Sequence, residues 1–297
     1  MTAQRKARRR SLRYRVVDVF TENPLEGNPL AVFPDASELD DATMQKIARE
    51  LNLSETTFLL PPARSDCAAN VRIFTPAMEM PFAGHPTVGT AFVLLDEGLD
   101  RDSFLLEEKV GPVPIRVEPG KRPMIWLRTP PIQDGKIFDR ALCAEVLGLH
   151  SNDLLEIPPQ YLSAGNPTVF VALKDKTVVD RACLDLTGLR RLKNPDPEPV
   201  CVFVFAPVPE GAYSRMFAPE YGVPEDPATG SSTGPLAAFM MRHGLVALAS
   251  GTRFISEQGT KMGRRSLLHV QIHGEHGCDG IDVGGYVTPL VEATMRL

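Results

Sequence analysis

The apolar positions at the start of the chain alternate with polar ones, as in a strand that is buried on one face. Residues 14–20 follow this pattern and are rich in β-branched side chains, so they predict a β-strand. The stretch ENPLEGNP then predicts a turn, because proline, glycine and asparagine favour turn conformations. A second strand is expected over residues 30–33.

A helical pattern follows these two strands. The apolar residues at helical spacing are Met44, Ile47, Ala48 and Leu51. Asp40 or Asp41 can cap the first turn, and Asn52 marks the end of the helix. Residues 54–60 then predict another strand. Glu55 therefore begins a strand just after a helix ends, where its side chain can be directed into a site.

Two stretches of the chain recur in the same order further along it. RIFTP at residues 72–76 returns as RMFAP at residues 215–219. GHPTVGTAFVLLDEGL at residues 84–99 aligns without gaps to GSSTGPLAAFMMRHGL at residues 230–245. One such match could arise by chance. Two matches in the same order, about 145 residues apart, indicate a duplicated domain.

Each copy predicts a strand, an irregular Pro-rich loop and an apolar helix that begins at a glycine and ends at Gly98 or Gly244. Residues 91–95 and 237–241 are apolar on all sides, so both helices should be buried. The remaining segments look like short strands, and residues 192–199 like a surface loop. The expected fold class is α+β, with two pseudo-symmetric domains that each wrap a curved β-sheet around a central α-helix.

The length of 297 residues suits two domains, and 43% hydrophobic residues can build a sizeable core. We expect a basic, disordered tail over residues 1–13, an N-terminal domain over residues 14–130 and a C-terminal domain over residues 131–297. A return of the extreme C-terminus to the first domain stays open. The tail carries seven Lys/Arg residues before Val16. Because no aromatic residues are interleaved with these charges, the tail is predicted to be a solvated segment and not one that binds nucleic acid or a membrane.

The overall charge and the cysteine pattern narrow the class of protein. A net charge of −5 gives no indication of a nucleic-acid partner. No run of 18 apolar residues is present, so no membrane span is expected. The five cysteines are odd in number and scattered without a C-x-x-C pair, which is typical of a reduced, cytoplasmic protein.

The two glycine-led helix starts are candidate anion sites. Gly84-His85 opens one predicted helix and Gly230-Ser231 opens the other. The first amides of a helix have no intrahelical partner, and the helix dipole adds partial positive charge there. If the two halves face each other, both helix starts can bind one small carboxylate in the cleft between them.

Residues suited to proton transfer lie beside these helix starts. His85 follows the first glycine, Glu225-Asp226 precedes the second, and Glu55 completes the set. Proton removal from carbon needs a base poised near neutral pH and fixed dipoles for the developing charge. A glutamate in an apolar cleft beside a substrate carboxylate has its pKa raised by desolvation and by the like charge. Glu55 is therefore the candidate that takes a proton and returns it elsewhere.

Long stretches of the chain resemble the PhzF family of phenazine biosynthesis, whose members share the diaminopimelate epimerase-like fold. They are VVDVFTENPLEGNPLAVF, IARELNLSETTFLL, RIFTPAMEMPFAGHPTVGTA, RMFAPEYGVPEDPATGSSTGPLAAFMMRHG and EQGTKMGRRSLLHV. Together they run from about residue 16 to residue 270. The resemblance implies a pseudo-symmetric two-domain enzyme, usually a homodimer, without metal or organic cofactor. The type member of the family isomerises trans-2,3-dihydro-3-hydroxyanthranilate.

The resemblance also assigns roles to residues of this chain. The catalytic glutamate of the family's N-L-S-E motif falls on Glu55, the histidine of G-H-P on His85, and the aspartate of E-D-x-A-T-G-S on Asp226. The carboxylate-binding turns of the family fall on Gly84, Gly230 and Ser231. The expected partner is thus a small carboxylate, with neither nucleic acid nor membrane involved.

Related racemases and epimerases of this fold carry a cysteine at each of the two helix starts. Here Ala83 precedes Gly84, Thr229 precedes Gly230, and no cysteine lies within fifteen residues of either turn. Stereoinversion by a pair of thiols at these turns is therefore excluded on residue type. A proton shift that uses one base remains open. The alternatives are a PhzF-like isomerase or epimerase of another substrate, and a binding protein of the same fold without catalysis.

Two other patterns suggest different chemistry. Residues 230–234 match G-x-S-x-G, but the preceding PEYGVPEDPA is a poor strand, and a hydrolase nucleophile requires a strand that runs into the turn.

The C-terminal region carries possible metal ligands at His269, His273, His276 and Cys278. Residues four apart in a strand are about 13 Å apart, which is too far to bind one ion, so a solvated strand and hairpin are favoured.

Overall fold

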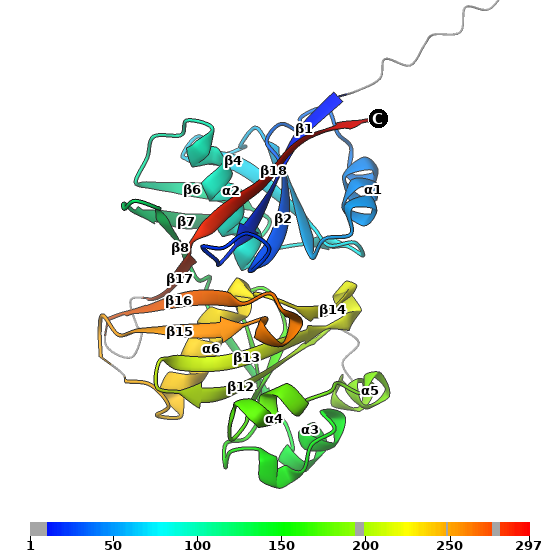
Figure 1. Cartoon of the computed structure of the whole chain (residues 1–297), viewed down its shortest axis with the longest axis vertical. Coiled ribbons are helices and arrows are strands. Elements are labelled where there is room, and N and C mark those ends of the chain that lie inside the picture. The colour runs from blue at the N-terminus through cyan, green and yellow to red at the C-terminus, as the bar shows by residue number, and fades with distance from the viewer. Residues whose placement is uncertain (1–10, 194–198, 248, 275–279) are drawn as a thin grey trace, which may run out of the picture.

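The computed structural model describes residues 11–193, 199–247, 249–274 and 280–297. Two lobes follow one another along the long axis, and each is a sheet curved around one central helix (Figure 1). The predicted α+β fold class, with two similar halves, is confirmed. The first ten residues of the predicted tail and residues 194–198 of the predicted surface loop lie outside the described part of the chain.

The first half follows the predicted order of strands and helices. Its elements are β1 (Ser11–Val19), β2 (Asn28–Phe33), α1 (Asp41–Leu51), β3 (Glu55–Leu60), β4 (Cys67–Phe74), β5 (Glu79–Met80), α2 (Gly84–Asp96), β6 (Ser103–Glu108), β7 (Gly111–Glu118) and β8 (Met124–Arg128). β1 starts at Ser11, so the sheet takes in residues 11–13 that were assigned to the tail. The predicted cap of α1 is confirmed, because the Asp40 carboxylate accepts from the Thr43 amide and Asn52 ends the helix in the left-handed conformation.

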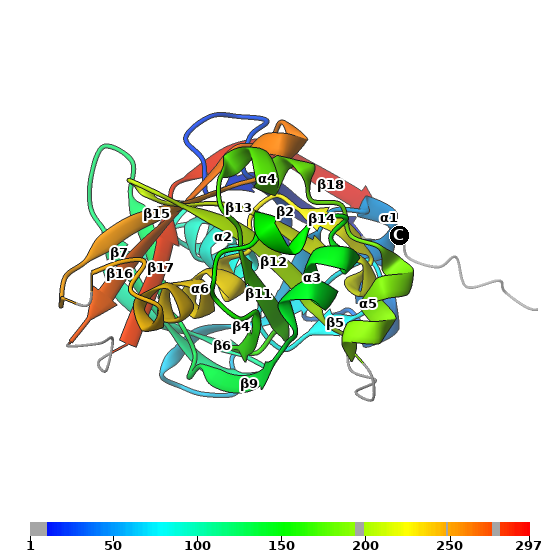
Figure 2. The same ribbon diagram turned by 90° about the horizontal axis from the view of Figure 1, so that it is seen from below.

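The second half carries three outer helices that the sequence pattern did not predict. Its elements are β9 (Gln133–Ile137), α3 (Arg140–Val146), β10 (Gln160–Ser163), β11 (Thr168–Ala172), α4 (Lys176–Arg181), α5 (Leu186–Lys193), β12 (Cys201–Val208), β13 (Gly211–Ala218), β14 (Val223–Asp226), α6 (Gly230–Arg242), β15 (Arg253–Gln258) and β16 (Ser266–His273). Figure 2 shows α3, α4 and α5 together at the end of this half. Only short strands were expected there. That expectation is wrong, because Val146, Val179 and Leu189 each bury an apolar helix face in one cluster on the outer side of the sheet.

The two half-sheets pair their strands in the same order. The first runs β18-β1-β2-β3-β4-β6-β7-β8 and the second β9-β10-β11-β12-β13-β15-β16-β17. In each run the same two pairs are parallel, namely β2–β3 and β4–β6 in the first and β11–β12 and β13–β15 in the second. β17 (Gly280–Gly285) joins the halves by pairing with β8. β18 (Val287–Arg296) then pairs with β1, so the chain ends in the first half (Figure 1).

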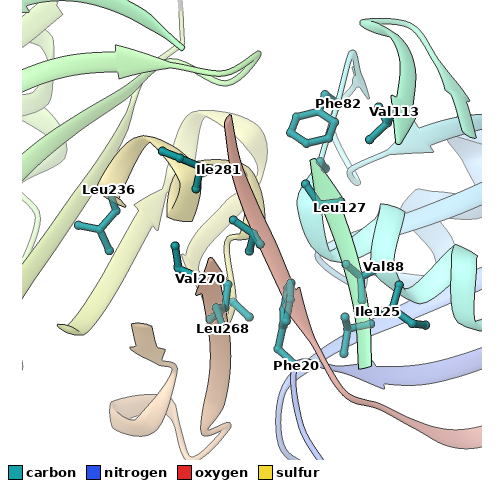
Figure 3. Packing of buried hydrophobic residues seen from close by; sticks show 14 of the residues in the cluster. Phe20, Phe82, Val88, Val113, Ile125, Leu127, Leu236, Leu268, Val270 and Ile281 are labelled. Carbon is teal, nitrogen blue, oxygen red and sulfur yellow. The ribbon is translucent and has the colours of Figure 1, made fainter. Parts of the chain in front are cut away.

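One apolar core runs through both halves, with α2 and α6 inside it. Both helices are buried over most of their length, as predicted. Figure 3 shows Phe82, Val88 and Leu127 of the first half on one side of β17, and Leu236 and Val270 of the second half on the other side. The core therefore fixes the starts of α2 and α6 relative to one another. Within the described residues, no helix is both long and apolar enough to cross a membrane.

Candidate active site

The starts of α2 and α6 meet head to head at the boundary between the halves. A Cβ atom built on Gly84 would lie 2.5 Å from both the Gly230 Cα and the Ser231 backbone nitrogen. A Cβ atom on Gly230 would lie 2.9 Å from the Gly84 Cα. Real Cβ contacts are not this short, so only glycine fits at either position. No side chain caps either helix start, which leaves the first amides of both helices available to a ligand.

A pocket opens at this meeting point and contains all six residues predicted for the site. Its lining residues are Glu55, Thr75, Met80, Ala83, Gly84, His85, Asn166, Cys201, Met216, Ala218, Tyr221, Val223, Asp226, Thr229, Gly230 and Ser231. Most of these residues are buried, and both halves contribute to the wall. The Glu55 Oε2 and the His85 Nε2 are buried atoms without a hydrogen-bond partner among the described residues. Unpaired polar atoms of this kind are suited to a ligand.

Glu55 reaches the pocket from the first position of β3. It pairs with Leu30 of the parallel strand β2, and its side chain is only 13% exposed. Burial raises the pKa of Glu55 well above its ordinary value, and the negative charge of Asp226 raises it further. Glu55 therefore keeps its proton to a higher pH than a surface glutamate does, and its ionised form is a stronger base.

His85 stands at the second position of α2 as a neutral ring. The Asn28 Nδ2 lies 3.1 Å from the His85 Nδ1, which accepts a hydrogen bond there in the tautomer that carries the ring proton on Nε2. Burial lowers the pKa of His85 to about 3. The 3.4 Å separation of the His85 Nε2 from the Glu55 Oε2 is thus a contact of a neutral ring, not an ion pair.

Asp226 comes from the end of β14 in the second half and is held by residues of both halves. Its Oδ1 accepts from the Asn28 Nδ2 at 2.7 Å, and its Oδ2 accepts from the Thr229 Oγ1 at 2.5 Å. Burial raises the pKa of Asp226 to about 6, although hydrogen bonds from Thr229, Asn28 and Ser54 oppose that rise. Asp226 and Glu55 are thus two buried carboxyls with raised pKa values, and ionisation of one makes ionisation of the other less favourable.

Two asparagines that the sequence reading missed tie the halves together. Besides its contacts with His85 and Asp226, Asn28 donates to the Ala228 carbonyl of the second half. Asn166 donates to the Phe82 carbonyl of the first half and to the Ser231 Oγ. The signal was present in the sequence, because G-N-P occurs at residues 27–29 and again at 165–167. This third repeat marks the asparagine of each half.

The strand register shows which residues correspond between the two halves. Thr56 pairs with Phe74 and Val202 pairs with Phe217, so Glu55 and Cys201 hold the same position. By the same alignment, Met80 corresponds to Asp226. Cys201 is buried in the pocket wall, and burial raises the pKa of its thiol, as do the charges of Asp226 and Glu55. Cys201 lies far from both helix starts in the sequence and reaches the pocket from a separate strand, β12, so the sequence did not predict a thiol there.

The hydrolase motif does not assemble a nucleophile. PEYGVPEDPA does contain a strand, β14, contrary to the prediction. However, the central serine of the motif, Ser232, is fully buried, and its Oγ lies 3.0 Å from the Thr168 Oγ1. This hydroxyl is held by a structural hydrogen bond within the core. It cannot be presented at the surface of the pocket as a hydrolase requires.

His269 and His273 lie on β16, as predicted, and alternate along it with the buried residues Leu268, Val270 and Ile272. The His273 Nε2 lies 2.8 Å from the Asp282 Oδ2. The other two possible ligands, His276 and Cys278, lie outside the described residues. Within the described segments, no group of three or more His, Cys, Asp or Glu side chains is arranged to hold a metal ion.

Comparisons with known proteins agree on one family. The sequence profile described as phenazine biosynthesis-like protein matches residues 17–292. The chain is 39% identical to trans-2,3-dihydro-3-hydroxyanthranilate isomerase of Pseudomonas aeruginosa, over 88% of this chain and 91% of that relative. A crystal structure of a PhzF-family phenazine biosynthesis protein from Bacillus anthracis matches with a TM-score of 0.84 at 28% identity, over 97% of this chain and 100% of that one. A hydroxyproline epimerase from Agrobacterium vitis shares the fold, with a TM-score of 0.64 at 14% identity over 97% and 92% of the two chains.

Proposed function

This chain belongs to the phenazine biosynthesis-like (PhzC-PhzF) family, and from that premise we propose that it is an isomerase that moves a proton on a small carboxylate substrate. The substrate that we propose is trans-2,3-dihydro-3-hydroxyanthranilate, which gives the Pseudomonas aeruginosa relative its name. In this proposal protein side chains and backbone amides carry out each proton transfer, without a metal or an organic cofactor.

One observation carries this proposal: two helix starts touch at Gly84 and Gly230, and the carboxyl of Glu55 lies in the same pocket. The free amides of Gly84, Gly230 and Ser231 bind the substrate carboxylate, supported by the dipoles of α2 and α6. This binding brings a carbon next to the carboxylate within reach of Glu55. The amides also stabilise the negative charge that develops when that carbon loses a proton.

Glu55 is the acid and base of the proposed reaction. Its ionised carboxylate takes a proton from one carbon of the substrate, and the same carboxyl returns a proton to another carbon of the conjugated system. The C–H bond that breaks is matched by the C–H bond that forms, so the enzyme ends in the state in which it began. The raised pKa supports this role, since it strengthens the base and keeps the acid form available near neutral pH.

His85 and Asp226 hold the polar substituents of the substrate. The neutral His85 offers its Nε2–H toward the Glu55 side of the pocket, where it can donate to a hydroxyl or amino group. Asp226 accepts hydrogen bonds and, once ionised, raises the basicity of Glu55. Asn28 supports both side chains at once, because its Nδ2 contacts each of them.

The test is an assay of trans-2,3-dihydro-3-hydroxyanthranilate in heavy water, followed by its ultraviolet change and by deuterium incorporation at carbon. We expect Glu55→Gln to reduce kcat/KM by about 10²–10⁴-fold, the range for loss of a general acid/base. Glu107→Gln on β6 is the matched control and should keep wild-type activity. Full activity of Glu55→Gln would overturn the mechanism. Inactivity of the wild type would remove the substrate and leave the reaction class to be tested on related acids.

Epimerisation of another carboxylate is the second candidate, because Cys201 holds the position equivalent to Glu55 in the same pocket. A thiol and a carboxyl on two sides of one carbon would invert it. A binding protein without catalysis would show neither reaction, although ligand would still raise its unfolding temperature.

The proposal also covers the setting of the enzyme, which we take to be a cytoplasmic homodimer that acts on small molecules and not on nucleic acid or membranes. The family resemblance, the net charge of −5 and the four described cysteines, all unpaired, support it. Leu290 and Val291 of the edge strand β18 are 37% and 41% exposed and offer an apolar contact. Light scattering of the purified chain measures the oligomeric state.

A further inference from the structure

A buried carboxyl that the proposed reaction does not use lies beneath the start of α2. Glu108 ends β6, and only 4% of its surface is exposed. Its Oε1 lies 2.6 Å from the Thr87 Oγ1, and its Oε2 is buried without a hydrogen-bond partner among the described residues. Thr87 stands on the first turn of α2, one helical turn after Ala83, so Glu108 is connected to the candidate carboxylate site through one side chain.

The contacts of Thr87 reveal where the protons are. The Thr87 Oγ1 lies 2.7 Å from the Ala83 carbonyl oxygen as well as 2.6 Å from Glu108. A hydroxyl has a single hydrogen and can donate to only one of these two oxygens. The carbonyl cannot donate, so the second short contact requires a hydrogen on Glu108. The consistent arrangement is a chain in which Glu108 donates to Thr87 and Thr87 donates to Ala83.

The second half supports this arrangement. Thr233, the counterpart of Thr87, donates to the Thr229 carbonyl at 2.9 Å in the same way. Asn70 pairs with Glu107 and Tyr213 pairs with Glu257, so the counterpart of Glu108 is the next residue after Glu257, namely Gln258. Gln258 is a neutral amide that is fully buried. It accepts from the Thr229 amide and donates to the Asp226 carbonyl, and thereby supports the start of α6.

We propose that Glu108 is a positioning residue that works in its protonated form: through Thr87 it holds the first turn of α2 in the shape that binds the substrate carboxylate, and its ionisation weakens that binding. This role rests on the proposed function, since it assumes that a carboxylate binds at Gly84. An ionised Glu108 would take the Thr87 hydrogen and release the Ala83 carbonyl. It would also place a negative charge behind amides that bind an anion.

The charged groups around Glu108 do not compensate for the negative charge that it would gain on ionisation. A second pocket brings Glu108 together with Asp41 of α1, Arg72 of β4, Glu79 of β5, Glu107 of β6, and Lys109, which directly follows β6. Arg72 is already paired with both Glu79 and Asp41. His85 of α2 is neutral. Burial raises the pKa of Glu108 to about 8. The carboxyl is therefore protonated at neutral pH and ionises in mildly alkaline solution.

The first experiment measures binding of 3-hydroxyanthranilate, a stable aromatic analogue, by calorimetry between pH 6 and 9.5. In the wild type we expect the Kd to rise by up to tenfold per pH unit above about pH 8. Glu108→Gln keeps a donor to Thr87 and cannot ionise, so that alkaline rise should disappear. Glu107→Gln, on the same strand, should keep it. Glu55 and Asp226 titrate in all three proteins, so only the difference between them reports Glu108.

The second experiment needs no ligand. The pKa of Glu108 is higher in the folded state than in the unfolded state. The stability that this difference provides is therefore fully present below about pH 4.5 and is lost as the pH rises to about 8. Between pH 5 and pH 8, the unfolding temperature of the wild type should therefore fall relative to that of Glu108→Gln. A constant difference would show that Glu108 is not protonated and would overturn the proposal.

The two experiments separate the possible failures. Equal alkaline rises of Kd in wild type and Glu108→Gln would overturn the positioning role while the carboxylate site stands. Absence of binding by the wild type at every pH would contradict the proposed function, and the positioning role would fall with it. In that case the unfolding comparison would still establish the protonation state of Glu108.

Discussion

The two halves of the pocket are built alike but carry different chemistry. The corresponding residues, with the first half named first, are Gly84 and Gly230, Asn28 and Asn166, His85 and Ser231, Glu55 and Cys201, and Met80 and Asp226. The glycines and asparagines are the same in both halves. Asn28 contacts the ionisable residues His85 and Asp226, and Glu55 lies beside His85, whereas Asn166 donates to the Phe82 carbonyl and the Ser231 hydroxyl.

This comparison shows that the glycines and asparagines of the site are the same in both halves, whereas the ionisable residues differ. Binding an anion between two helix starts needs both glycines, and holding the starts together needs both asparagines. A proton shift with one base needs an acid/base group on one side only. The pocket therefore combines a symmetric binding frame with one reactive side, which is the arrangement that the proposed isomerisation requires.

The symmetric frame is broken most severely by Gly84→Ala. The new methyl group would meet the backbone of Gly230 and Ser231, which cannot move aside as a flexible side chain can. We expect a loss of at least about 3 kcal/mol of unfolding free energy, since overpacking against backbone is at the costly end of its range. Activity should fall about 100-fold or more, because small displacements of a reacting group have effects of that size. Urea unfolding and kcat/KM measure both quantities.

Gly120→Ala in the exposed turn between β7 and β8 is the matched control, because its new methyl group would meet only the Arg122 carbonyl oxygen, at 3.1 Å, and a shift of a few tenths of an ångström in this turn relieves that contact. It should behave like the wild type. Equal stability of Gly84→Ala and Gly120→Ala would contradict the head-to-head contact of the two helices.

The reactive side is tested by Asp226→Asn, which removes a charge and keeps the shape. We expect kcat/KM to fall about 30-fold, the equivalent of ~2 kcal/mol for a hydrogen bond to a charged group. Without the Asp226 charge, the pKa of Glu55 falls toward its ordinary value. The rise of kcat/KM with pH should therefore move to lower pH in the variant. A pH profile that stays in place would show that Asp226 and Glu55 do not interact.

The neutral side is tested by Cys201→Ala, for which we expect the smallest effect. If proton transfer uses Glu55 alone, kcat/KM for isomerisation should stay within about threefold of the wild type, since general acid/base groups contribute far more than this. A loss of 100-fold or more would mean that the thiol takes part and would favour the epimerase alternative. Retained deuterium exchange with lost epimerisation of a test acid would point the same way.

Much of the frame could be predicted from the sequence, because it depends on local signals. The helix starts at Gly84 and Gly230 follow from glycine before an apolar run, and the helix α1 from its spacing and its cap. The duplication was visible as two repeated stretches. Glu55 could be found because it begins a strand within a motif of the family that the chain resembles.

The remaining features depend on contacts between distant strands. Cys201 enters the pocket only because β12 occupies in the second half the place of β3 in the first. Asn28 supports Asp226, which lies 198 residues away in the sequence. The helices α3 to α5 are short, and their stability comes from packing on the sheet, so their composition alone gave a weak signal.

The return of β18 to β1 has a consequence for biosynthesis. During translation the whole segment from β2 to β17 emerges between β1 and its second partner strand, β18. The amino-terminal lobe thus cannot complete its sheet until β18 has emerged, and β18 follows directly after β17, the last strand of the other lobe, so the two lobes are completed together. A premature stop codon at Thr288 would remove most of β18 and leave β1 without its outer partner strand.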